Sequence, residues 1–200
     1  MTVSAATTRE RILLEASVLF ARQGYHRTTT RDIAAAVGIQ QPSLFYHFSS
    51  KTEIMSTLLH AAIDGALAAV ESQLEADGSP AQRLHRYIVM DLVAVCESPY
   101  NLAGTTTQAV LADPEFEEAA GRFQRLFDAR TRLIRAGIEV GEFSPVNAEL
   151  ASRAIEWVIE GLSTEIGAGR PEDLESIAGE VADFCVRALL VDCSSLDEIR

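Results

Sequence analysis

Residues 28–48 have the sequence Thr-Thr-Thr-Arg-Asp-Ile-Ala-Ala-Ala-Val-Gly-Ile-Gln-Gln-Pro-Ser-Leu-Phe-Tyr-His-Phe. Thr29 with Asp32 three positions later predicts a capped helix start, and Gly38 predicts where that helix ends. Pro42 suits the first turn of a second helix, which ends near Phe48. Two short helices, at about 30–37 and 42–48, joined by a tight turn indicate a helix-turn-helix, whose second helix enters the major groove of DNA.

The side chains of this stretch divide into two groups. The apolar group would hold the two helices together and against a preceding helix over residues 7–23, which has its own apolar face. Its members are Ile33, Ala34, Val37, Ile39, Leu44 and Phe48. The outward group consists of hydrogen-bonding types that can reach phosphates and base edges. It comprises Thr30, Arg31, Gln40, Gln41, Ser43, Tyr46 and His47. Phe45 is expected to be structural, like Phe48.

The charge of the chain is distributed unevenly. The net charge is −12, which by itself argues against a polyanionic partner. Residues 1–52 nevertheless carry six basic and only three acidic side chains, whereas residues 53–200 carry the remaining 11 basic and 26 acidic ones. This division predicts two domains, a DNA-binding domain at 1–52 and a larger one at 53–200 that does not face DNA.

The rest of the chain has helical periodicity throughout, and no strand or repeat is evident. Expected helices cover Lys51 to about Ala76, residues 81–97, a short ambiguous stretch at 101–111, Pro114 to about Gly137, 146–166 and 172–191. The breaks between them contain glycine and proline, as at Asp77-Gly-Ser-Pro80. The fold class is therefore predicted to be all-α, with about nine helices in total.

Composition limits the remaining function classes. No apolar run reaches the roughly 18 residues of a membrane span, and the first residues do not resemble a secretory signal, so a cytoplasmic location is expected. The three cysteines, Cys96, Cys185 and Cys193, are scattered, which disfavours a disulfide framework. The four histidines lack the spacing of a metal site. Neither a metal nor a cofactor is expected.

Residues 8–55 resemble the DNA-binding domain of the TetR family of bacterial regulators. The matching landmarks, in order and at the expected spacing, are Leu19-Phe20-Ala21, Gly24-Tyr25, Thr28-Thr29, Ile33-Ala34, Val37-Gly38-Ile39, Leu44 to Phe48, and Ser50-Lys51-Thr52-Glu53. The larger domain resembles the family weakly, through Asp113-Pro114-Glu115 and residues 137–143. The resemblance implies a regulator, most often a repressor, that leaves a palindromic operator when a small inducer binds.

Several roles follow from this resemblance by position. Thr29 and Thr30 would bind phosphate at a helix N-terminus, Arg31 would contact phosphate or a base, and Lys51 would neutralise a phosphate. Gln40, Gln41 and Ser43 are the expected base contacts, and Tyr46 and His47 would hold the DNA backbone. The family often has Ser-Lys-Gly-Thr where this chain has Gln40 to Ser43. The usual lysine is missing, and Gln41 could instead contact adenine with two hydrogen bonds.

The last two predicted helices have apolar faces wide enough for both a core and a partner. A homodimer through a four-helix bundle would cover the second stripe, as the resemblance also implies, and a two-fold operator needs two copies. A larger monomeric core is the alternative. The expected interface residues are Ala154, Ile155, Val158, Gly161, Leu162, Val181, Phe184, Cys185 and Ala188.

The middle helices, about 81–136, are expected to enclose the inducer. Their mixture of apolar bulk with a few polar groups suits a largely apolar ligand with one or two hydrogen-bonding groups. The candidate lining residues are Met90, Cys96, Asn101, Thr105, Thr106, Phe123, Phe127 and Trp157. Ligand binding would move the helix that begins near Lys51 and so change the separation of the two recognition helices.

Two other function classes stay open at this point. A helical enzyme finds no support in any nucleophile–base pair, paired carboxylates or phosphate loop, so the protein is not expected to be an enzyme. A dimeric ligand-sensing or interaction module without DNA binding is the second alternative.

Overall fold

The structure, a computed structural model, describes residues 6–100, 110–166, 173–195 and 199. Within these ranges the chain forms eight α-helices and two short 3-10 helices, and its one β-type contact is an isolated bridge between Phe143 and Leu190. The all-α prediction is confirmed. The expected helix at 101–111 lies outside the described residues apart from its last two positions. The chain divides into two compact units, residues 1–62 with 98–120 and residues 63–97 with 121–200.

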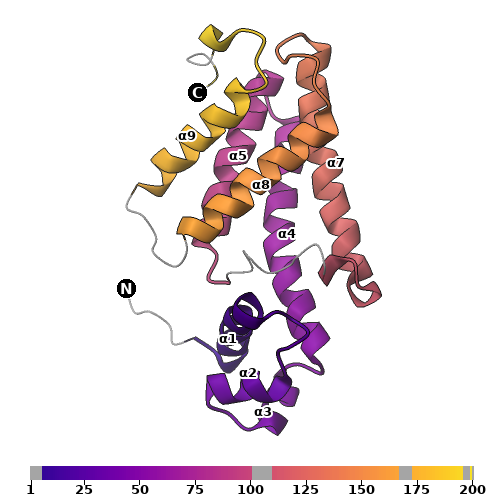
Figure 1. Cartoon of the computed structure of the whole chain (residues 1–200), viewed down its shortest axis with the longest axis vertical. Helices are drawn as coiled ribbons and strands as arrows, with labels where there is room; N and C mark the ends of the chain where they lie inside the picture. The colour runs from indigo at the N-terminus through magenta and orange to yellow at the C-terminus, as the bar shows by residue number, and fades with distance from the viewer. Residues whose placement is uncertain (1–5, 101–109, 167–172, 196–198, 200) are drawn as a thin grey trace. The chain divides into compact units, whose positions relative to one another are not determined.

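Unit 1 contains the three N-terminal helices, α1 (Thr8–Gln23), α2 (Thr30–Val37) and α3 (Gln41–His47) (Figure 1). Thr7 caps α1 and Thr29 caps α2, and each forms a reciprocal capping box with an acidic residue three positions later. Gly38 follows α2 at φ 77°, a conformation that favours glycine. These short-range signals place the helix ends within a residue or two of the sequence prediction.

A small apolar core holds the helices of unit 1 together. The predicted apolar residues Ile33, Ala34, Val37, Leu44 and Phe48 are all at most 3 % exposed, and α2 packs against both α1 and α3. The first part of α4 (Lys51–Glu75) and the 3-10 helix η1 (Pro114–Phe116) also belong to this unit. Helix α4 is long and apolar enough to cross a membrane by length and composition alone, but half of the relevant window is buried inside the protein, as in a core helix.

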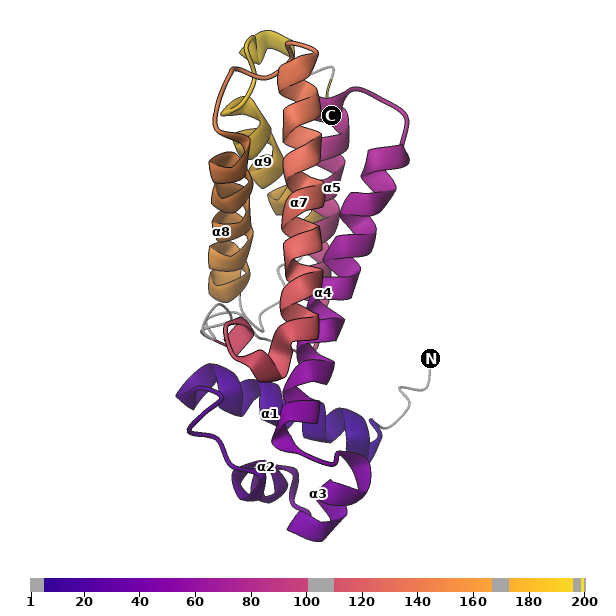
Figure 2. The ribbon, with the colours of Figure 1, turned by 90° about the vertical axis from the view of Figure 1, so that its right-hand side faces the viewer.

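Unit 2 contains the rest of α4 together with α5 (Pro80–Glu97), most of α7 (Glu117–Glu139), α8 (Ala148–Ile166) and α9 (Leu174–Arg187). Helix α5 packs most extensively on α9 and also against α8. In Figures 1 and 2 the helices of this unit lie side by side as a bundle. Its core is aliphatic with a few aromatic side chains, including Leu84, Ile88, Leu92, Ile134 and Phe143.

Two helices have ends that differ from the sequence prediction, the one expected to begin at Pro114 and the last one. Pro114 opens a turn of 3-10 helix, and α7 begins only at Glu117 and continues to Glu139. The last helix ends at Arg187, not at 191, because the following residues pair with another segment: Ser144 donates its N–H to the carbonyl of Leu189, and Val191 to that of Glu142. A long-range pairing of this kind has no local signal in the sequence.

Candidate functional site

The exposed surface of α3 and of the start of α2 forms the candidate DNA interface in unit 1. Leu44 of α3 is completely buried against the other helices. The residues on the opposite side are therefore turned outward: Tyr46 is 87 % exposed and Phe45 46 % exposed. Of the predicted contacts, Thr29, Arg31, Gln40 and Ser43 are also exposed, and Thr30, Gln41, His47 and Lys51 are partly so. The exposure of Phe45 differs from the expectation of a structural role, since α3 turns this ring half into solvent.

Two of the predicted phosphate contacts have partners inside the chain. The hydroxyl of Thr29 donates to Asp32 Oδ2 at 2.7 Å and accepts from the Asp32 N–H at 3.1 Å. Lys51 Nζ donates to the carbonyl oxygens of Tyr25 and Thr28, at 2.8 and 2.9 Å. Burial lowers the pKa of Lys51. Both side chains thus have structural roles here, and their contact with phosphate stays a prediction.

The side chain of Gln41 is connected to α2. Its Nε2 donates to the hydroxyl of Thr30 at 2.9 Å, which joins the first residue of α3 to the first residue of α2. Both residues are predicted DNA contacts, but their contact with each other has no signal in the sequence, because it depends on how α2 and α3 cross.

Other basic residues of unit 1 support the fold of this module. Arg9 lies with its guanidinium carbon 4.6 Å from the centre of the Phe48 ring, and Arg11 donates to the carbonyl of Val37 at the end of α2. Since Val37 is the last residue of α2, Arg11 satisfies one of its free carbonyls. Part of the positive charge that the sequence assigns to DNA contact is thus used within the module.

Tyr25 of unit 1 connects the start of α4 with the segment before α7. Tyr25 packs edge-on against Phe116, with ring centres 5.3 Å apart. Its hydroxyl forms a hydrogen bond of 3.2 Å with Thr52, and the Thr52 hydroxyl reaches Glu115 at 3.3 Å. Tyr25, Thr52 and the pair Glu115 and Phe116 are therefore linked by direct contacts within unit 1.

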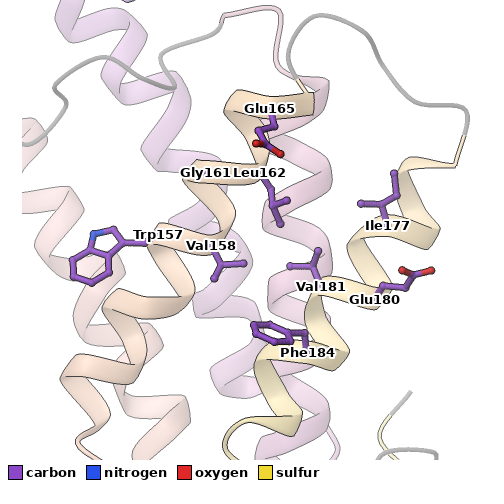
Figure 3. A pocket seen from close by; sticks show the side chains of 9 residues that line it. All are labelled: Trp157, Val158, Gly161, Leu162, Glu165, Ile177, Glu180, Val181 and Phe184. Carbon is purple, nitrogen blue, oxygen red and sulfur yellow. The ribbon is translucent and has the colours of Figure 1, made fainter.

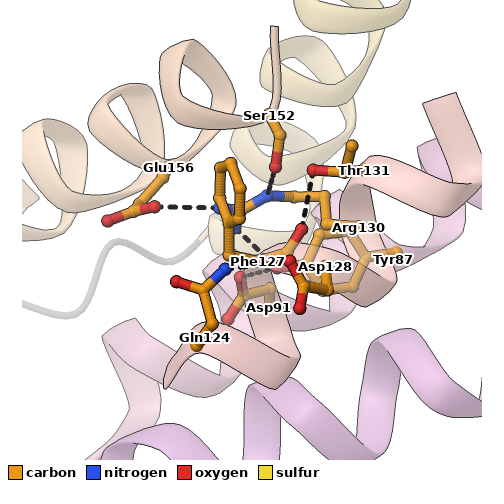
Figure 4. Close-up of polar contacts among 9 residues, drawn as sticks. All are labelled: Tyr87, Asp91, Gln124, Phe127, Asp128, Arg130, Thr131, Ser152 and Glu156. Carbon is orange, nitrogen blue, oxygen red and sulfur yellow. Dashed lines mark hydrogen bonds and ion pairs between the residues drawn. The ribbon is translucent and has the colours of Figure 1, made fainter. Parts of the chain in front are cut away.

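In unit 2 a buried network of polar side chains lies among α5, α7 and α8 (Figure 4). Arg130 is 2 % exposed and donates to Ser152 at 2.9 Å, Tyr87 at 3.2 Å and Glu156 at 2.9 Å. The Tyr87 hydroxyl in turn donates to Asp91 at 2.6 Å. Burial raises the pKa of Asp91, against the hydrogen bond from Tyr87 and the positive charge of Arg130.

The residues of this network are not among the predicted site residues. A signal was present, because Asp91 lies on the apolar face of its helix together with Leu84, Tyr87 and Ile88. A carboxylate at a core position requires buried partners. The identity of those partners depends on which face of α7 meets α5, which local periodicity does not specify.

Five of the eight predicted inducer-lining residues lie within the described residues, and they differ in their exposure. Asn101, Thr105 and Thr106 lie outside the described residues. Phe127 is buried, with the guanidinium of Arg153 4.6 Å from its ring centre, and Phe123 and Cys96 are partly buried. Met90 is 43 % exposed and Trp157 58 % exposed. Burial raises the pKa of Cys96.

A shallow groove runs between α8 and α9 (Figure 3). Its walls are mainly apolar, and its acidic members are Glu165 and Glu180. The lining residues are Trp157, Val158, Gly161, Leu162, Glu165, Ile177, Glu180, Val181 and Phe184. Five of the nine predicted dimer-interface residues are therefore groove residues, and Trp157, predicted to line the inducer pocket, lies here as well.

The other four predicted interface residues divide into two pairs. Ala154 and Ala188 are exposed on α8 and directly after α9. Ile155 and Cys185 are only 4 % and 5 % exposed and belong to the core of unit 2. Burial raises the pKa of Cys185 to about 11. The protomer itself therefore covers Ile155 and Cys185, because they lie on the inner side of their helices.

An exposed recognition helix, locked by a small core and carrying polar side chains, defines a helix-turn-helix DNA-binding protein. The sequence profile of the bacterial regulatory proteins of the tetR family matches residues 12–58. The chain is 28 % identical over 156 residues to the HTH-type transcriptional repressor KstR2 of Mycobacterium tuberculosis (strain H37Rv), covering 75 % of this chain and 78 % of KstR2.

Solved structures agree with this similarity over nearly the whole chain. The crystal structure of Mycobacterium smegmatis AmtR superposes with a TM-score of 0.79 at 30 % identity, covering 98 % of this chain and 94 % of AmtR. The structure of AibR in complex with isovaleryl coenzyme A and operator DNA gives a TM-score of 0.72 over 92 % of this chain and 98 % of AibR. At 18 % identity AibR shows the fold alone. The chain belongs to the TetR family of bacterial transcriptional regulators.

Proposed function

We propose that this protein is a cytoplasmic, ligand-responsive repressor that binds a two-fold symmetric operator as a homodimer and is not an enzyme. The observation that supports DNA binding is the surface of α3, where Ser43 and Tyr46 are exposed on a helix whose opposite side is buried, and where Gln40 is exposed directly before that helix. The donor and acceptor groups of such side chains match those in the major groove. The relatives support repression, since KstR2 is described as a transcriptional repressor.

The proposed contacts are the predicted residues apart from Thr29 and Lys51, whose polar groups form hydrogen bonds within unit 1. Gln40, Gln41 and Ser43 contact bases, while Arg31, Tyr46 and His47 contact the sugar-phosphate backbone together with Thr30. The proposal includes a DNA-binding domain at residues 1–52 and a ligand-binding domain at residues 53–200. Only the first domain has a positive balance of charge, which suits a polyanionic partner.

Homodimer formation is proposed through the α8–α9 groove. Phe184 is 67 % exposed and Trp157 58 % exposed, and exposed apolar surface of this kind marks an interaction site. A second copy supplies a partner of the same chemistry, because a two-fold interface brings the same apolar stripe from both chains. The dimer also presents two recognition helices, which a palindromic operator requires at a spacing of about 34–36 Å.

The effector is proposed to be a small, largely apolar molecule held among the middle helices. AibR, of the same fold, binds isovaleryl coenzyme A and operator DNA. Helices α4 and α7 each contribute residues to both compact units, so a ligand that displaces them in unit 2 can alter unit 1. The ligand shifts the equilibrium only as far as it prefers the state that does not bind DNA.

One two-stage experiment tests the proposal. Genomic fragments bound by the purified protein are selected and sequenced, and a mobility shift measures affinity for the enriched fragment. Metabolites that raise the melting temperature are then added to the complex. We expect a palindromic fragment, and at least one stabilising metabolite that releases it. The proposal is wrong if no sequence is enriched above random fragments, or if every stabilising metabolite leaves the affinity unchanged.

A further inference from the structure

The hydrogen bond between Gln41 and Thr30 joins a predicted base contact to a predicted phosphate contact. Gln41 Nε2 donates to Thr30 Oγ1 at 2.9 Å, and both side chains are only partly exposed. Gln40, the residue directly before, is exposed, and its side chain makes no capping hydrogen bond to α3. The two adjacent glutamines thus differ, because Gln41 has a fixed anchor on α2.

The groups that this bond leaves unused determine what Gln41 can contact. A side-chain amide has two N–H groups and an oxygen with two lone pairs. After one N–H is given to Thr30, the second N–H and the oxygen Oε1 remain. One donor beside one acceptor is the pattern that matches N7 and the N6 amino group of adenine. Fixing the amide before DNA arrives also reduces the entropy that binding must remove.

The hydroxyl of Thr30 retains a function of its own. As the acceptor from Gln41 it still has its proton, which it can donate to a phosphate oxygen. The hydroxyl of the neighbouring Thr29 differs, because it donates to Asp32 Oδ2 within the capping box. A single hydroxyl on α2 can therefore connect the backbone of the DNA to the side chain that contacts a base.

We propose that Thr30 is a positioning residue for sequence recognition: its hydroxyl holds the Gln41 amide so that one N–H and Oε1 are presented to an adenine edge. This inference rests on the proposed DNA binding and adds to it. Thr30 then affects base preference at one position of each half-site, whereas a contact with phosphate alone would affect all sequences equally.

The test selects binding sites from a library of random-sequence DNA duplexes, using the full-length protein. The wild type is compared with Thr30→Val, which removes the hydroxyl but keeps the shape, with Thr30→Ser, which keeps the hydroxyl, with Gln41→Ala, and with the double variant. Thr57→Val is the matched control, since the hydroxyl of Thr57 bonds to its own helix at Glu53. Thermal unfolding checks that each variant is folded.

Gln41→Ala should lower discrimination at one A·T pair per half-site by about tenfold or more, as expected for a lost two-bond contact. Thr30→Val should lower it at the same pair by about fivefold, the effect of one neutral hydrogen bond. Thr30→Ser and Thr57→Val should leave the motif unchanged. Adding Thr30→Val to Gln41→Ala should have no further effect on this preference.

Three results would overturn the inference while leaving DNA binding intact. The first is a binding motif of Thr30→Val that is identical to that of the wild type. The second is a loss of affinity of Thr30→Val that is equal for all sequences. The third is a binding motif in which Gln41→Ala changes no position. A wild-type protein that enriches no motif would instead overturn the proposed function, and the inference with it. The two failures are therefore distinguishable.

Discussion

Lys51 Nζ lies 4.2 Å from the centre of the Tyr25 ring and donates a 2.8 Å hydrogen bond to the carbonyl oxygen of the same residue. A second bond, to the carbonyl of Thr28, joins the start of α4 to the turn between α1 and α2. The only lysine of the chain thus cross-links the helix-turn-helix module, in addition to any contact with DNA.

Replacing Lys51 by methionine should therefore act mainly on stability. The variant leaves two carbonyl groups without their donor, and we expect a loss of about 1–3 kcal/mol in the free energy of unfolding. The dependence of DNA affinity on salt should stay unchanged, whereas Arg31→Ala should reduce its log–log slope by about one. Urea titration and mobility shifts at several salt concentrations measure both effects. A reduced slope without a loss of stability would instead assign Lys51 to phosphate.

The Arg130 network predicts a large loss of stability on truncation. Arg130→Met leaves Glu156 and Asp91 without a buried positive partner, and we expect a loss of about 3–5 kcal/mol in the free energy of unfolding. Arg135→Ala is the control, because its ion pair with Glu149 is exposed and should contribute less than about 1 kcal/mol. Chemical denaturation of both variants provides the comparison, and equal effects would contradict a structural role for the network.

Asp91 predicts a pH dependence of stability. Its raised pKa means that the folded protein holds this proton more tightly than the unfolded chain does. The resulting contribution to stability is complete below the ordinary pKa of 3.8 and is lost as pH rises through the folded-state pKa. Asp91→Asn keeps an oxygen for the Tyr87 hydroxyl but cannot ionise. The melting temperature of this variant minus that of the wild type should therefore increase with pH.

Thermal unfolding from about pH 4 to about pH 7, the range above the ordinary pKa of an aspartate, measures this difference. Asp128→Asn, at an exposed carboxyl that accepts from Gln124, is the matched control on α7. A difference for Asp91→Asn that decreases over this range would contradict the prediction, because it would show that folding favours the ionised carboxylate of Asp91.

The groove between α8 and α9 predicts the effect of charge on assembly. Phe184→Glu or Trp157→Glu places a carboxylate in an apolar stripe, and we expect the dimer to weaken by about 30-fold or more, as for a central interface residue. Val140→Glu is the control, since Val140 is 64 % exposed but does not line the groove. Sedimentation velocity over a concentration series reports the association. Wild-type protein that stays monomeric would refute this interface.

Two glycines of α7 predict opposite effects of the same substitution. A Cβ atom at Gly137 would lie 2.2 Å from the Phe143 ring, whereas one at Gly121 would meet no atom within 4 Å. Gly137→Ala should cost about 1–3 kcal/mol through overpacking, and Gly121→Ala should stabilise by up to about 1 kcal/mol through helix propensity. The melting temperatures of the two variants test this prediction. An unchanged melting temperature for Gly137→Ala would show that the Phe143 ring can move away from the added methyl group.

The sequence alone determined the helix-turn-helix and most helix boundaries. Thr29, Asp32 and Gly38 act on backbone groups a few residues away, so their effect does not depend on the rest of the fold. The family followed from landmarks within the same stretch. The apolar faces of the other helices were also evident, because their repeat is a property of each helix by itself.

Only the tertiary structure decided which partners the side chains have. It turned Ile155 and Cys185 into the core and left Trp157 and Phe184 exposed, a choice that a wide apolar face leaves open until neighbouring helices cover one side. It brought Arg130 to Tyr87, and Gln41 to Thr30. These contacts join residues 43 and 11 positions apart, and the distance between such residues is set by how helices cross, which is a property of the packed chain.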